Sequence, residues 1–211
     1  MNLSKIWITK RVFKILPMTK EQAYDFLRTF FRMEVESKWS EYKETESIKE
    51  SLMKVAGFLA GETHKRGLFL CGHVGNGKTT LLTCISKLYG YLTSEGYIEY
   101  NESTRGFESI SAQELALSVI DDKELYDKCK RCDKLIIDDV GEDATEIPVY
   151  GVNRNPVKDV IMYRYEHRLL TIISSNLNAK LIKEKYHDER LSDRIREMYE
   201  IVVFKDNSFR R

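Results

Sequence analysis

The sequence predicts an α/β fold in which a parallel five-stranded sheet carries helices on both faces, preceded by a short helical segment. Three observations predict it. From residue 67 onward, short apolar runs typical of buried strands alternate with segments of helical spacing, which is the pattern of a parallel sheet with crossover helices. A glycine-rich loop separates the first such strand from the first such helix. The chain of 211 residues is long enough to bury one sizeable core.

We expect the chain to divide at residue 45, into a helical segment 1–45 and a main domain 46–211. Thr19 and Gln22 have the spacing of a capping box, and they open a helix expected to run to about Ser37. One face of this helix is apolar, and it consists of Ala23, Phe26, Leu27, Phe30 and Phe31. That aromatic face has two interpretations: it packs on the main domain, or it docks on a partner protein.

The remaining elements follow from apolar spacing and from start and stop signals. A polar connector precedes a second helix, which begins near Ile48 and stops at Gly61. Further helices are expected after Ser111, after Asp122, and from Pro156 to about Arg168. The predicted strands lie near 67–71, 97–100, 134–138, 170–174 and 201–204, and residues 107–110 could add to the second of them.

The glycine-rich loop, residues 72–79, fits the spacing G-x-x-x-x-G-K-[ST] without a gap. A loop of this kind wraps its backbone N–H groups around the phosphates of a nucleotide at the positive end of a helix. Lys78 would reach the β/γ-phosphates, and the Thr79 hydroxyl would be a Mg²⁺ ligand. The residues predicted to hold the nucleotide are Gly72, Val74, Gly75, Asn76, Gly77, Lys78, Thr79 and Thr80.

Two further predicted strands end in polar side chains. The apolar run 135–137 is followed by Asp138 and Asp139, at the strand end where open α/β sheets bind ligands. We expect Asp138 to hold Mg²⁺ through its water shell and Asp139 to orient the attacking water. The run 171–175 ends at Asn176, whose amide can hydrogen-bond the γ-phosphate or that water. A simple turn or helix-cap role is the alternative for Asn176.

Two arginines, Arg190 and Arg194, stand four residues apart on one predicted helical face. An arginine at the rim of a neighbouring subunit can stabilise the charge that develops on a transferring phosphoryl group. The alternative is a solvated face on which both arginines pair with the acids close by in sequence.

Composition restricts the remaining possibilities. The net charge of +1 means that any contact with nucleic acid must come from a local basic patch. There is no signal-peptide pattern and no apolar window near ~18 residues, so we expect a cytoplasmic protein with no membrane association.

Cys129 and Cys132 have C-x-x-C spacing, but a structural zinc site needs about four ligands. We therefore expect ordinary reduced thiols, with metal binding or redox chemistry as the alternative.

Taken together, these motifs resemble the additional-strand AAA+ ATPases, and among them the bacterial replicative helicase loaders of the DnaC/DnaI type. Those loaders are related to the initiator DnaA and to the IstB transposition helpers. The resemblance covers about residues 48–205. It rests on the paired aspartates of 138–141, on the Arg-Tyr helix end and sensor strand of 163–176, and on the arginine box of 189–194.

The resemblance implies an AAA+ P-loop NTPase that uses ATP and Mg²⁺ and hydrolyses ATP slowly within an oligomer. It makes Asn176 the sensor 1 residue and Arg194 the arginine finger that acts on an adjacent copy, with Arg190 as a weaker alternative. It further implies a helicase loader in DNA replication, whose N-terminal helices contact a replicative DNA helicase and whose core contacts single-stranded DNA.

The sequence also departs from the loaders. The stretch 143–156 is longer and less regular than in typical loaders, and Leu170 stands where the loaders usually have a proline before the sensor strand. We expect neither a helical lid domain after the fifth strand nor a zinc-bearing docking domain.

Alternative functions remain open. An IstB-like transposition helper is one, and a small-molecule P-loop kinase is another. The third is a protein that binds nucleotide but scarcely hydrolyses it, because Asp139 is shorter than the glutamate common in AAA+ enzymes.

Overall fold

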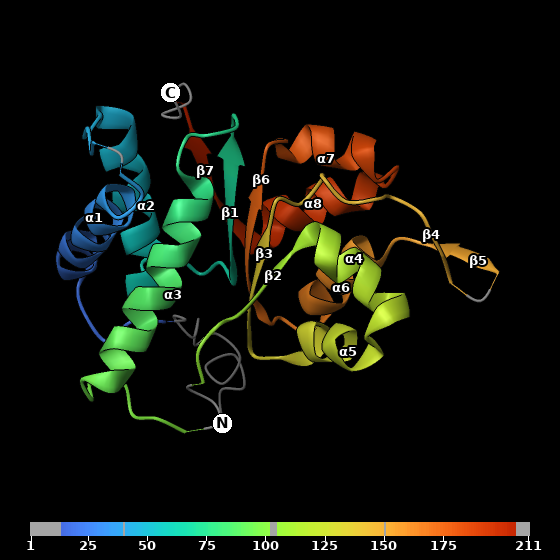
Figure 1. Cartoon of the computed structure of the whole chain (residues 1–211), viewed down its shortest axis with the longest axis horizontal. Helices are drawn as coiled ribbons and strands as arrows, with labels where there is room; N and C mark the ends of the chain where they lie inside the picture. The colour runs from blue at the N-terminus through green and yellow to red at the C-terminus, as the bar shows by residue number, and fades with distance from the viewer. Residues whose placement is uncertain (1–13, 40, 102–104, 150, 206–211) are drawn as a thin grey trace, which may run out of the picture.

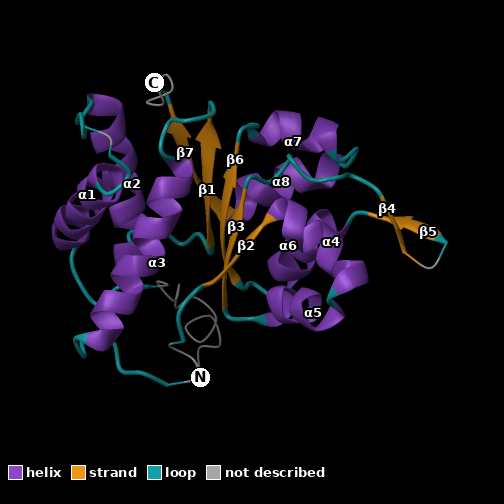
Figure 2. Ribbon diagram, in the orientation of Figure 1, coloured by secondary structure: helices purple, strands orange, loops and turns teal. Residues whose placement is uncertain are grey.

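The computed structural model describes residues 14–39, 41–101, 105–149 and 151–205. Its described strands form a five-stranded parallel sheet of order β2-β3-β6-β1-β7, flanked by helices on both faces (Figure 2). The strands are β1 (Gly67–Gly72), β2 (Glu108–Ser111), β3 (Lys134–Asp138), β6 (Leu170–Ser175) and β7 (Tyr199–Phe204). The central strands β1 and β6 are buried along nearly their whole length, as a sheet covered on both faces requires. The predicted fold class is confirmed.

One face of the sheet is covered by three helices, α1 (Lys20–Glu36), α2 (Glu46–Ala60) and α3 (Lys78–Ser94) (Figure 1). The predicted capping box opens α1, because Thr19 and Gln22 exchange side-chain and backbone hydrogen bonds. Leu27 and Phe31 of α1 are buried in the same core as Leu68 of β1. For these residues, packing on the main domain is therefore the interpretation that the structure supports. The division of the chain at residue 45 stays a prediction.

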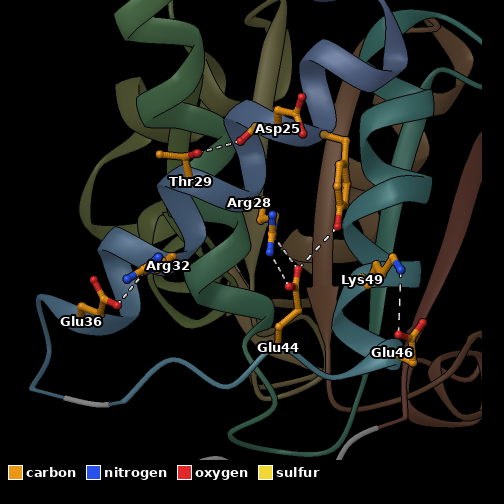
Figure 3. Close-up of polar contacts among 9 residues, drawn as sticks. Asp25, Arg28, Thr29, Arg32, Glu36, Glu44, Glu46 and Lys49 are labelled. Atoms are coloured by element: carbon orange, nitrogen blue, oxygen red, sulfur yellow. Dashed lines mark hydrogen bonds and ion pairs between the residues drawn. The ribbon is translucent and has the colours of Figure 1, made fainter.

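The segment that joins α1 to α2 is tied back to α1 by charge. Nε and Nη2 of Arg28 donate to the two carboxylate oxygens of Glu44, at 2.7 and 2.6 Å (Figure 3). This bidentate pair lowers the pKa of the Glu44 carboxyl, because it stabilises the ionised form. The connector is thus held against α1. Further on, Gly61 ends α2 in the left-handed conformation, as predicted.

In the described part of the chain, five helices cover the other face and its end (Figure 1): α4 (Ala112–Asp121), α5 (Lys123–Arg131), α6 (Pro156–Glu166), α7 (Ala179–Lys185) and α8 (Glu189–Met198). The predicted starts of three of them are confirmed. Ser111, Asp122 and Asn155 each accept a backbone N–H of the first turn that follows. None of the helices described combines the length and the apolar character that a membrane crossing needs.

The prediction of a strand at 97–100 is wrong. Tyr97 and Ile98 instead donate their backbone N–H groups to Leu92 O at the end of α3. The second strand is β2, which overlaps the added range 107–110 and not 97–100. The side chains of Tyr97 and Tyr100 are exposed, so this aromatic run lacks the burial that makes β propensity effective. Residues 102–104 lie outside the described residues.

A hairpin was not predicted between β3 and α6. Strands β4 (Ile147–Val149) and β5 (Val152–Arg154) pair antiparallel and project from the body of the molecule (Figure 1). Each strand has three residues, and β4 contains Pro148. Such strands are too short for a period of two to be visible in the sequence. The hairpin accounts for the irregular length of 143–156.

Candidate nucleotide-binding site

The glycine-rich loop connects β1 to α3 at the carboxyl end of the sheet (Figure 1). Gly75 and Gly77 have φ angles of 81° and 96°, which residues other than glycine rarely adopt. At Gly77 there is a second reason, because a Cβ would lie 2.9 Å from Cζ of Phe31 on α1. The glycines of the motif therefore meet a backbone and a packing requirement.

Lys78 begins α3, is buried, and folds back over the loop. Its Nζ donates to Gly72 O at 2.8 Å and to His73 O at 2.9 Å. It also donates to Oδ1 of Asn76 at 3.2 Å and to Oδ1 of Asn176, beyond the end of β6, at 2.9 Å. The ammonium thus connects the predicted loop to the predicted sensor residue.

The predicted metal pair is also brought together. Oδ1 of Asp138, at the end of β3, accepts a hydrogen bond from Oγ1 of Thr79 at 3.3 Å. It also accepts from the Asp139 backbone N–H at 3.1 Å and from the Ser174 hydroxyl. A carboxylate and a hydroxyl at this spacing supply hard oxygen ligands, so Thr79 and Asp138 could hold Mg²⁺ whose other ligands are phosphate and water.

Asp139 lies directly beside this pair. Its φ of 55° is left-handed, and its backbone N–H is fixed by Ser174 Oγ at 2.9 Å as well as by Asp138. The strained turn is therefore held by β6. It stops β3 and directs the chain across the carboxyl end of the sheet.

Asn176 bridges two charged groups of opposite sign. Its Oδ1 accepts from Lys78, and its Nδ2 donates to Oε1 of Glu142 at 3.1 Å. Glu142, which comes four residues after Asp138, is not among the site residues predicted from the sequence. One sequence feature does point to Glu142: it is an acidic residue in the loop that directly follows the predicted strand ending at Asp138. Ligands bind at that end of the strands in open α/β sheets.

Two buried side chains anchor the loop that carries Glu142. The backbone N–H of Gly141 donates to Oδ1 of Asp143 at 3.0 Å and to the Tyr186 hydroxyl at 3.1 Å, and that hydroxyl donates to Asp143 in turn. Burial raises the pKa of the Asp143 carboxyl, and the hydrogen bond from Tyr186 opposes the shift. Loop and α7 are thereby joined.

The predicted arginines lie elsewhere in the same chain. Both belong to α8, across the sheet from α3 (Figure 1). Nη1 of Arg194 donates to the Tyr165 hydroxyl at 2.6 Å and lies 3.4 Å from Oε2 of Glu197, and its guanidinium covers the Tyr165 ring. Nε of Arg190 lies 3.5 Å from Asp188. Neither of these contacts involves the glycine-rich loop.

The cysteine pair lies at the end of α5, beside the buried Arg164. All four cysteines are free, and burial raises the pKa of Cys129 to about 11, so its thiol stays protonated. The described residues contain no group of three metal-ligating side chains. The backbone oxygens of Cys129 and Cys132 instead accept from Nη1 of the buried Arg164, at 3.0 and 2.7 Å.

No protein-family model matches the chain, and no curated protein matches it. Solved structures do. DnaI superposes with a TM-score of 0.57 at 21% identity, over 84% of this chain and 94% of that chain. The DnaC helicase loader gives 0.56 at 20%, over 78% and 93%. AMPPCP-bound DnaA from Aquifex aeolicus gives 0.56 at 18%, over 80% of this chain and 50% of that chain.

Fold and comparisons together define the class: the chain has the AAA+ P-loop NTPase fold. Within that class it is similar to the DnaC and DnaI structures along most of their length. A putative primosome component from Streptococcus pyogenes serotype M3 is also similar, with a TM-score of 0.51 at 19% identity, over 90% of this chain and 81% of that chain. The likeness to DnaC, DnaI and DnaA agrees with the resemblance that the motifs indicated.

Proposed function

We propose that this chain binds ATP with Mg²⁺ and hydrolyses it slowly, in an oligomer, as a switch that loads a replicative DNA helicase onto single-stranded DNA. The observation that carries the nucleotide part is a convergence at one end of the sheet. There Lys78 contacts Asn176, and Thr79 contacts Asp138. Three parallel strands deliver these groups, as expected of a ligand site in an α/β sheet.

Each group has a proposed role. The backbone of the loop and Lys78 hold the phosphates, while Thr79 and Asp138 hold Mg²⁺. Asp139 orients the attacking water, and Asn176 contacts the γ-phosphate. Arg194 of an adjacent copy completes the site and stabilises the charge of the transition state. ATP then favours one assembly state, and its hydrolysis releases that state.

Lys78→Ala tests the nucleotide part. The variant removes the cation that faces the β/γ-phosphates, so we expect tight binding of ATP with Mg²⁺ to be lost. Binding is measured by calorimetry on the full chain. Lys87→Ala is the matched control, because Lys87 is a cation of the same helix that contacts Glu34 of α1 instead of the loop. Equal affinities of Lys78→Ala and the unaltered protein would contradict the proposal.

The partner is tested separately, because the core alone does not distinguish a helicase loader from a transposition helper. The likeness to a structure described as the DnaC helicase loader supports the first. We expect the full chain, immobilised on resin in the presence of ATP, to retain a replicative helicase and no transposase. Retention of the transposase alone would favour the IstB-like alternative. Phosphate release that depends on a small acceptor would favour a kinase.

A further inference from the structure

Hydrogen bonds hold both ends of the Asn176 side-chain amide. Its Oδ1 accepts from Lys78 at 2.9 Å, and its Nδ2 donates to Glu142 at 3.1 Å. A lysine ammonium can only donate, and an ionised carboxylate can only accept. The orientation of the amide is therefore determined by chemistry: its oxygen faces the loop, and its NH₂ group faces Glu142.

The backbone that carries Glu142 is well fixed, whereas its side chain is exposed. On the N-terminal side, Val140 N donates to Ser174 O at 2.9 Å, and Glu142 N donates to Asp139 O at 3.1 Å. On the C-terminal side, Asp143 is buried against Tyr186. The carboxylate therefore starts from a defined position, and it can turn into solvent without the cost of burying a charge.

We propose that Glu142 sets the preference of this site between ATP and ADP, which rests on the proposed function as a nucleotide-binding protein. The γ-phosphate, like the carboxylate, is an anion that only accepts hydrogen bonds. Both compete for the NH₂ group of Asn176, and they repel each other when close. ATP must displace Glu142 from Asn176. ADP has no γ-phosphate and leaves the contact in place.

Glu142 is thus a positioning residue that acts through Asn176 and lowers the affinity for ATP relative to ADP. The repulsion of two partly solvated anions a few ångströms apart is worth roughly a three- to tenfold change in affinity. This change is confined to nucleotides with a γ-phosphate. A residue that merely supported the fold would alter the affinity for both nucleotides in parallel.

The test uses the full chain and two ligands, AMPPCP and ADP, each with Mg²⁺. Glu142→Gln removes the charge and keeps the length of the side chain. Glu146→Gln is the matched control: it removes the same charge in the same loop, where Glu146 accepts from Nδ2 of Asn153 at 2.9 Å. We expect Glu142→Gln to tighten AMPPCP binding about three- to tenfold and to leave ADP binding unchanged, because only the γ-phosphate meets the carboxylate. Glu146→Gln should change neither.

Glu142→Ala provides a second variant, since it also removes the hydrogen-bond acceptor, and it should tighten AMPPCP binding at least as much. An unchanged ratio of the two dissociation constants in Glu142→Gln would overturn the inference, as would weaker AMPPCP binding. Both results leave the proposed function intact as long as the unaltered protein binds nucleotide. An unaltered protein that binds neither ligand would instead refute the proposed function itself.

Discussion

At the scale of single residues, Arg164 of the Arg-Tyr helix end stabilises the fold. It is fully buried, and its donors go to backbone oxygens at the end of α5, to Leu170 O at 2.6 Å and to the Thr171 hydroxyl at 2.8 Å. The carbonyl end of a helix carries partial negative charge, which stabilises a buried cation. Burial lowers the pKa of Arg164, yet arginine remains charged at neutral pH. Arg164 thus joins α5, α6 and β6.

We expect Arg164→Met to lower the free energy of unfolding by about 3 kcal/mol, because several buried carbonyl groups lose their donor. Arg164→Lys should lose less, since it keeps the charge but lacks the planar fork. Denaturant titration followed by circular dichroism measures both. Arg196→Met, on an exposed position of α8, is the control. Equal midpoints for Arg164→Met and this control would refute the structural role.

At the scale of elements, α1 is coupled to the glycine-rich loop. Phe31 is buried and lies behind Gly77, and its ring also meets that of Tyr42 edge-on, with centroids 6.1 Å apart. The neighbouring residue Phe30 instead contacts Tyr91 of α3, with ring centroids 5.9 Å apart. A partner that moves α1 would therefore also disturb the loop that we propose holds the phosphates.

This coupling predicts a difference between two adjacent phenylalanines. Phe31→Ala should lower the free energy of unfolding by about 3 kcal/mol and weaken binding of ATP with Mg²⁺, because the loop loses the ring behind Gly77. Phe30→Ala, at a partly buried position, should cost less stability and leave ATP affinity unchanged. Affinities are compared at a temperature where both variants remain folded. Equal losses of affinity would show that the contact with Gly77 has no special importance.

At the scale of the whole molecule, one chain holds an incomplete version of the proposed site. Thr79, Asp138 and Asn176 lie at one end of the sheet, whereas Arg194 is on α8 and contacts Tyr165. The exposure of the Arg194 side chain is 40%, so it remains accessible to a second copy. Two copies arranged head to tail would bring loop and arginine together.

We expect Arg194→Ala to keep ATP binding and to lose the rise of hydrolysis rate per chain with protein concentration. Arg190→Ala should retain most of that rise. Mixing Arg194→Ala with Lys78→Ala should restore part of the activity, because the first supplies an intact loop and the second an intact arginine. Normal concentration-dependent turnover by Arg194→Ala alone would refute the finger assignment.

The sequence predictions are correct where a feature depends on residues close together in the chain, and they fail where it depends on residues far apart. The capping box of Thr19 and Gln22, the Gly61 stop and the loop from Gly72 to Thr79 depend on residues within a few positions of each other, and the expected helices and turns form there. The aromatic run 97–100 forms no strand, because strand formation depends on a neighbouring strand and on burial, which local sequence does not encode. Glu142 was missed for the same reason, since its partner Asn176 is 34 positions away.

By itself, the sequence determined the parallel α/β architecture and the chemical character of the loop, because both are encoded in local periodicity and in contiguous motifs. Only the tertiary structure decided that Lys78 reaches Asn176, 98 positions away, that Glu142 holds the same amide, and that Phe31 lies against Gly77. Contacts of this kind depend on strand order and helix packing, which bring distant segments to one end of the sheet and leave no local trace in the chain.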